Sequence, residues 1–118
     1  MTPVRIGAIV LRVDDLDRQL RFWSAALDYA PRQAPSEDWA VLAPRSGVGP
    51  NLSLDKRHSV AQVPPRTHLD LYTHDQEREV TRLLGLGAKR IDWPRPPAAD
   101  FVTLEDPEGN RFDVVQLR

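Results

Sequence analysis

The chain has 118 residues, a net charge of −1 at neutral pH, 41% hydrophobic residues and 28% charged residues, which is typical of one small globular domain. A near-neutral charge argues against a dedicated nucleic-acid-binding protein, and no apolar run approaches the ~20 residues that span a membrane. With no cysteine, the chain has no disulfide, thiolate nucleophile or Cys-based zinc site, and without a secretion signal we expect a cytoplasmic protein.

The first half of the chain predicts a strand, a helix and two more strands. Residues 4–13 are apolar and rich in β-branched side chains, as a strand is. A helix follows, with Asp14 or Asp15 as its cap and an apolar stripe at Leu16, Leu20, Trp23 and Leu27. The segments "DWAVLAP" and "PNLSLDKR" are then two short strands joined by a glycine-rich turn.

The second half repeats this order. Residues 67–74 alternate polar and apolar side chains, as a half-buried strand does. The segment "DQEREVTRLLGLGAKRI" predicts a helix that Gly85 or Gly87 ends, and "FVTLEDPEGNRFDVVQL" predicts two strands around a tight turn. In that turn Pro107 fixes the backbone φ angle of the first turn position, and Gly109 or Asn110 adopts the positive φ angle that the turn requires.

Trp23 and Leu83 occupy equivalent helix positions about half a chain apart, which indicates an internal duplication. We therefore predict an α+β fold of two βαβββ modules, at about residues 1–60 and 61–118, within a single domain. Their sheets would form one curved, half-open barrel with the helices outside. The concave face of this barrel, the cup, would be the main pocket.

Strand alternation predicts which side chains face the cup. In "THLDLY", Leu69 and Leu71 should face a helix, which turns His68, Asp70 and Tyr72 the other way. The same argument turns Asp113, Val115 and Leu117 inward on the last strand. In the first half it turns inward the side chains of Ala8, Val10, Arg12, Asn51, Ser53 and Asp55.

The segments "VDDLDRQLRFWSAALDY", "DWAVLAP", "HLDLYTHD" and "LEDPEGNRFDVV" resemble the vicinal oxygen chelate superfamily. This superfamily includes glyoxalase I, the bleomycin-resistance proteins and the extradiol dioxygenases, and the chain is most similar to its small bacterial glyoxalase-like domain proteins. The resemblance covers nearly the whole chain and implies the same paired βαβββ fold. For a chain this short it also implies a homodimer.

The resemblance implies four positions for metal ligands, of which the first is alanine here. That first position, seven residues before Asp15, is Ala8, which binds no metal. The second position corresponds to Asp55 or, in a less favoured alignment, Ser53. The third is His68 and the fourth is Asp113, four residues after the glycine of the turn. The implied metal set is therefore His68, Asp55 and Asp113.

These residues leave three hypotheses for function. Because Ala8 removes one ligand, the sequence favours a metal-free protein that binds a small organic molecule, with Arg12 or His68 pairing with Asp113. The alternative is a lyase, isomerase or dioxygenase that depends on a divalent metal such as Zn, Ni, Fe or Mn, with His68 and Asp113 as catalytic residues. A third is a metal-free enzyme in which His68 and Asp113 form a general base.

The predicted ligand site contains aromatic residues as well as charged ones. We expect Trp23 in the core, Trp39 at the wall of the cup, and Tyr72 within reach of a ligand. Trp93, in a proline-rich stretch, is either a lid or a ring clamped on Pro94 or Pro96. The predicted cup lining consists of Ala8, Val10, Arg12, Trp39, Asp55, His68, Tyr72, Trp93 and Asp113. Its polar members argue against a plain interaction protein with a filled cup.

Overall fold

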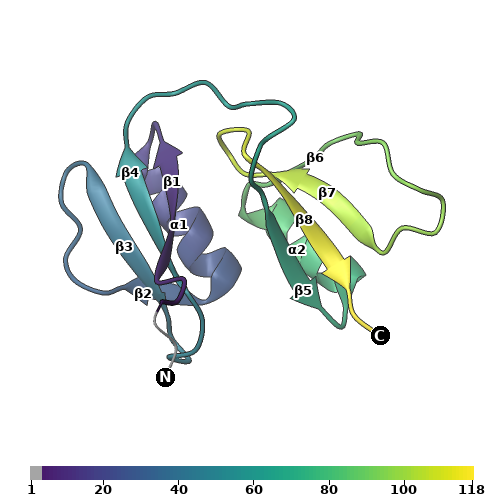
Figure 1. The fold of residues 1–118 in the computed structure, drawn as a ribbon, viewed down its shortest axis with the longest axis horizontal. Coiled ribbons are helices and arrows are strands. Elements are labelled where there is room, and N and C mark those ends of the chain that lie inside the picture. The colour runs from purple at the N-terminus through teal and green to yellow at the C-terminus, as the bar shows by residue number, and fades with distance from the viewer. Residues whose placement is uncertain (1–3) are drawn as a thin grey trace. The chain divides into compact units, whose positions relative to one another are not determined.

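The computed structural model describes residues 4–118, and its chain divides into two compact units, Met1–Ser59 and Val60–Arg118. Figure 1 shows that each unit contains one helix and one sheet, which makes the two units similar in architecture. Neither helix found between residues 4 and 118 has the length and apolarity that a bilayer crossing requires.

The first unit is a βαβββ module with a four-stranded sheet. Strand β1 pairs parallel with β4, β4 antiparallel with β3, and β3 antiparallel with β2. Its elements are β1 (Ala8–Val13), α1 (Leu16–Leu27), β2 (Tyr29–Pro31), β3 (Trp39–Pro44) and β4 (Asn51–Lys56).

The second unit has the same topology, with β5 parallel to β8 and the strand order β5-β8-β7-β6. Its elements are β5 (Leu69–Thr73), α2 (Gln76–Leu86), β6 (Lys89–Arg90), β7 (Phe101–Glu105) and β8 (Arg111–Gln116). The prediction of an α+β fold built from two βαβββ modules is therefore confirmed.

Two strand boundaries differ from the sequence prediction. Strand β1 begins at Ala8 instead of Val4, because its partner β4 begins at Asn51, directly opposite Ala8. Strand β5 begins at Leu69, so His68 lies just before the strand. Apolar pattern alone does not reveal where a neighbouring strand ends, and these boundaries depend on the neighbour.

Helix α1 buries a different face from the predicted one. Asp15 caps it, as expected, by accepting a hydrogen bond from the Arg18 backbone N–H. Leu20 and Leu27 are only half-buried, whereas the fully buried Gln19 belongs to the face at Leu16, Gln19, Phe22, Trp23 and Ala26. The prediction for Trp23 is confirmed, but counting apolar residues missed the buried glutamine.

In each sheet the apolar side chains of alternate residues face the helix. Leu52 and Leu54 of β4 are buried on this side in the first module, and Phe112 and Val114 of β8 in the second. The predicted alternation is confirmed for both strands. The opposite face of each sheet is therefore left for the polar side chains.

The turn between β7 and β8 is built as the sequence predicted. Gly109 has a φ of 90°, which is the left-handed conformation that favours glycine. The fully buried Asp106 accepts hydrogen bonds at Oδ1 from the backbone N–H groups of Glu108 and Asn110. The Asn110 side-chain amide donates to both of its carboxylate oxygens. These contacts fix the start of β8, and hence the position of Asp113.

Candidate functional site

A cluster of one histidine and two aspartates lies on the face of the second sheet opposite α2. His68 precedes β5, Asp70 lies within β5, and Asp113 lies within β8. The parallel register of β5 and β8 places Asp70 directly beside Asp113. We call these three residues the His68 cluster. The predicted partners His68 and Asp113 do come together.

Both carboxylates of the cluster approach the same imidazole nitrogen. His68 Nε2 lies 3.1 Å from Asp70 Oδ1 and 3.4 Å from Asp113 Oδ2. The Asp113 side chain is only 6% exposed, against 46% for Asp70. The second oxygen of Asp113, Oδ1, is buried and has no hydrogen-bond partner within residues 4–118. This oxygen therefore lacks the donor that buried acceptors normally have.

Asp113 is also paired with an arginine that the sequence analysis did not identify. Arg111 Nη2 lies 3.0 Å from Asp113 Oδ2, and the Arg111 side chain is only 14% exposed. The guanidinium carbon of Arg111 lies 4.0 Å from the centre of the Trp93 ring, which is a cation–π contact. Residues two apart on a strand share a face, so the signal for this pair was present in the sequence.

The His68 cluster matches a metal site in donor type and in spacing, but not in charge. One donor atom from each of its three residues lies within 4.8 Å of the other two, and imidazole with carboxylates suits Zn, Mn or Fe. However, the Arg111 guanidinium already neutralises Asp113. A divalent ion bound there would lie beside a fixed positive charge, which opposes binding. The donor atoms of the cluster therefore fit a divalent metal, whereas the charge of Arg111 disfavours one.

The cluster also differs from the predicted metal set in its membership. It contains Asp70 where the sequence analysis placed Asp55. Asp70 was expected to face the same way as His68, but it was not considered as a ligand. Asp55 belongs to the first module, where β1 and β3 place Arg12 and Trp39 on either side of it. Its role as a ligand stays a prediction.

The remaining predicted site residues lie on the sheet faces opposite the helices. In the first module the register aligns Ala8, Val10 and Arg12 of β1 with Asn51, Ser53 and Asp55 of β4. In the second, Tyr72 lies on the same face of β5 as Asp70 and is 68% exposed. Trp93 lies between β6 and β7 and contacts Arg111. The contacts of these residues with a ligand stay predictions.

The comparisons with known proteins identify the family. The family described as "Glyoxalase-like domain" matches residues 8–115, so the chain belongs to the glyoxalase-like domain family. Its fold is similar to that of solved structures described as a glyoxalase-related enzyme and as a glyoxalase/bleomycin resistance protein/dioxygenase family enzyme. A comparison with curated proteins found no match.

Three solved structures illustrate the likeness in fold. A glyoxalase-related enzyme from Fulvimarina pelagi has a TM-score of 0.74 and 16% identity, over 96% of this chain and 88% of that one. The fosfomycin resistance protein FosX from Mesorhizobium loti has a TM-score of 0.74 and 17% identity, over 100% and 95% of the two chains. The antibiotic-binding protein TnmS3 from Streptomyces sp. CB03234 has a TM-score of 0.70 and 21% identity, over 100% and 99%.

Proposed function

We propose that this protein binds a small organic molecule at the His68 cluster without a metal ion. The observation that carries the proposal is the pairing of Arg111 with Asp113, at 3.0 Å and with both side chains largely buried. A buried carboxylate needs a counter-charge, and the guanidinium supplies it here. The alanine at position 8, where the superfamily's metal enzymes have their first ligand, supports the same proposal.

The chemistry of the cluster indicates what the ligand must offer. The Oδ1 atom of Asp113 is a buried acceptor without a donor, so a ligand N–H or O–H would satisfy it once the side chains that cover it move aside. The exposed ring of Tyr72 adds apolar area and a hydroxyl on the same face. The antibiotic-binding protein among the structures of similar fold supports a compound of the antibiotic class. In the first module we propose Ala8, Val10, Arg12, Trp39 and Asp55 as ligand-contacting residues.

A thermal-shift screen in EDTA tests this proposal. A panel of antibiotics and aromatic compounds is added to the wild-type protein and to the variants His68→Ala and Asp113→Asn. We expect at least one compound to raise the wild-type Tm, because a ligand that binds only the folded state stabilises it. Both variants should reduce this shift.

His58→Ala is the matched control for the screen. His58 also contacts an aspartate, with Nδ1 at 2.9 Å from Asp14 Oδ1, but this pair belongs to the first module and its histidine side chain is 79% exposed. The control variant should therefore keep the full ligand shift. A hit that shifts His68→Ala and Asp113→Asn as strongly as the wild type would place the site elsewhere and contradict the proposal.

A metal-dependent lyase, isomerase or dioxygenase is the second candidate, favoured by the three donor atoms within 4.8 Å. It requires the ion to bind Asp113 beside the positive charge of Arg111, which contacts Oδ2 and leaves Oδ1 without a partner within the described residues. Elemental analysis of protein purified without chelator separates the two candidates. About one Zn, Ni, Fe or Mn ion per chain that is lost in His68→Ala would favour the enzyme.

We also propose a homodimer, on the strength of the superfamily resemblance for a chain of this length. Sedimentation equilibrium measures the mass directly. A mass near twice the 13.4 kDa of one chain supports the dimer, and a mass that stays at one chain across the concentration range contradicts it.

A further inference from the structure

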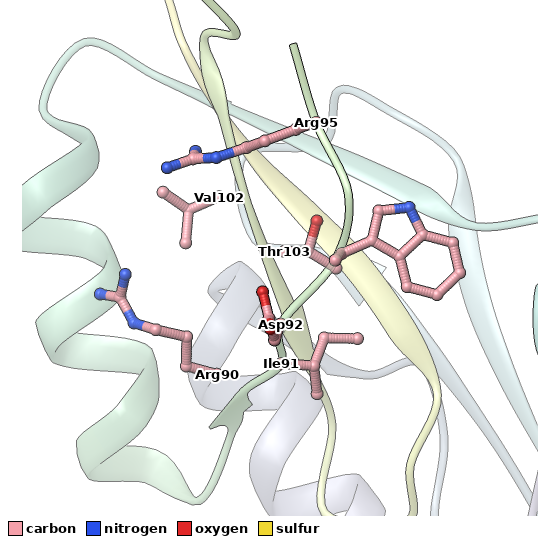
Figure 2. Close-up of a pocket in the computed structure, with 7 residues that line it drawn as sticks. Arg90, Ile91, Asp92, Arg95, Val102 and Thr103 are labelled. Atoms are coloured by element: carbon pink, nitrogen blue, oxygen red, sulfur yellow. The ribbon is translucent and has the colours of Figure 1, made fainter. Parts of the chain in front are cut away.

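The second module has a pocket at the β6–β7 edge of its sheet. This pocket has a volume of about 360 Å³, which lies within the usual range for small-molecule sites. Its lining consists of Arg90, Ile91, Asp92, Trp93, Arg95, Val102 and Thr103 (Figure 2). Trp93 also belongs to the predicted cup lining and Thr103 pairs with Asp113, so the pocket adjoins the His68 cluster. The two arginines that carry the inference, Arg90 and Arg95, are outside that cluster, so the inference does not rest on the proposed function.

The lining of the pocket carries more positive than negative charge. The lining contains two guanidinium groups, from Arg90 and Arg95, and one carboxylate, from Asp92. Within residues 4–118 neither arginine forms an ion pair with a carboxylate, unlike Arg111 and Arg82. Figure 2 shows the ends of both arginine side chains on either side of Val102. The pocket therefore presents two cationic hydrogen-bond donors without an acidic partner.

Other groups at the pocket give it a defined shape and an apolar wall. The Arg95 guanidinium donates a hydrogen bond to the Phe101 carbonyl, which anchors it beside β7 and leaves further N–H groups for a ligand. Ile91, Val102 and Trp93 supply apolar surface. The Thr103 hydroxyl is buried in the same wall and has no hydrogen-bond partner within the described part of the chain.

We propose that this pocket binds the oxyanion of a small acid, a carboxylate or a phosphate, between Arg90 and Arg95. Arginine recognises both groups because its planar donors match the geometry of paired oxygens. The apolar wall favours an organic acid over an inorganic ion. Because both arginine side chains are exposed, salt screens the attraction and weakens binding.

Titration of ¹⁵N-labelled protein with benzoate and, separately, with inorganic phosphate tests this proposal. We expect saturable shifts of the backbone amides of residues 90–93, 95 and 101–103, and of the Trp93 indole N–H. Arg90→Gln and Arg95→Gln should each weaken binding about tenfold, since each removes a charge-assisted hydrogen bond. Asp92→Asn should tighten binding, because it removes the repelling carboxylate.

Lys89→Gln is the matched control, since it removes the same charge from the neighbouring residue of β6, whose side chain faces the other way. It should bind the anion as the wild type does. If benzoate binds, alone or along with phosphate, the result supports an organic carboxylate as the natural ligand of the pocket. If only phosphate binds, the result supports a natural ligand that carries a phosphate group. No saturable shift with either anion, or equal affinities in the wild type and both arginine variants, would overturn the proposal.

Discussion

Asp113 is a charged side chain that is buried in strand β8, and its partners explain why it is tolerated there. Arg111 and His68 both contact its Oδ2 atom, so the buried charge is balanced within the second module. Replacing a partner would leave a carboxylate buried without its main counter-charge. This cost is larger than that of losing an exposed ion pair.

Arg111→Leu should therefore lower the free energy of unfolding by about 2–4 kcal/mol, with His68 offsetting part of the loss. Urea unfolding measures this change. In the double variant Arg111→Leu/Asp113→Asn the uncompensated charge is gone, so the double variant should be more stable than Arg111→Leu alone. If the two single effects simply add, the pair is not coupled and the charge argument is wrong.

Asp106 is a second buried aspartate, but it acts within the turn. Its Oδ1 atom accepts hydrogen bonds from two backbone N–H groups, and both of its oxygens accept from the Asn110 amide. Asp106→Ala leaves these donors unsatisfied and should cost about 2–4 kcal/mol of unfolding free energy. Asp106→Asn keeps an acceptor and should cost less. If Asp106→Ala and Asp106→Asn lose the same unfolding free energy, the hydrogen bonds at Oδ1 do not stabilise the turn.

The two helices end in the same backbone conformation but on different residues. Helix α1 ends at Asp28, with a φ of 55°, and α2 ends at Gly87, with a φ of 117°. Both values lie in the left-handed region, which glycine adopts without strain and other residues adopt at a cost. A Cβ added at Gly87 would meet only the Pro107 side chain, at an ordinary 3.6 Å, so the cost there is in the backbone.

Substitutions at these two positions should therefore have opposite effects. Gly87→Ala should lower the unfolding free energy by about 1–2 kcal/mol, whereas Asp28→Gly should raise it by about 0.5 kcal/mol. Thermal unfolding of both variants shows whether each substitution raises or lowers the stability of the protein. A loss of stability in both would mean that the exposed contact of Asp28 with Arg45, at 3.2 Å, outweighs the relief of strain.

The sequence predicted the elements of the fold better than their boundaries and faces. Helix stripes, turn residues and strand alternation are local signals, and they placed both modules and the buried faces of β4 and β8. The short strands β2 and β6 form because each pairs with a longer neighbouring strand. With three and two residues respectively, they are too short to show an alternation of polar and apolar side chains. The burial of Gln19 depends on tertiary packing, which no apolar stripe records.

The candidate site was predictable in part, because strand alternation is a local signal that the sequence carries. His68 and Asp113 lie on a face that alternation identifies, so their approach follows from the register of β5 and β8. Asp70 and Arg111 lie on that same face, but neither matches a ligand position that the resemblance implies. The pairing of Arg111 with Trp93 needed the course of the chain between β6 and β7, which sequence does not give.

At the scale of the whole molecule, the chain combines a fold found in proteins described with several functions and the His68 cluster of its second module. The fold alone does not decide between binding and catalysis, since function is carried by sites. In this chain the resemblance puts an alanine at the first implied ligand position, and an arginine pairs with Asp113 at the last. Both differences favour binding an organic molecule over binding a metal.

The most direct test of this account is the metal content of the purified protein. Wild type and His68→Ala are purified without chelator, incubated with excess Zn, Ni, Fe and Mn, desalted, and analysed for metal. Because the Arg111 guanidinium is paired with Asp113, we expect no stoichiometric metal in either protein. About one ion per chain in the wild type, lost in His68→Ala, would contradict it and show that the arginine yields to a metal.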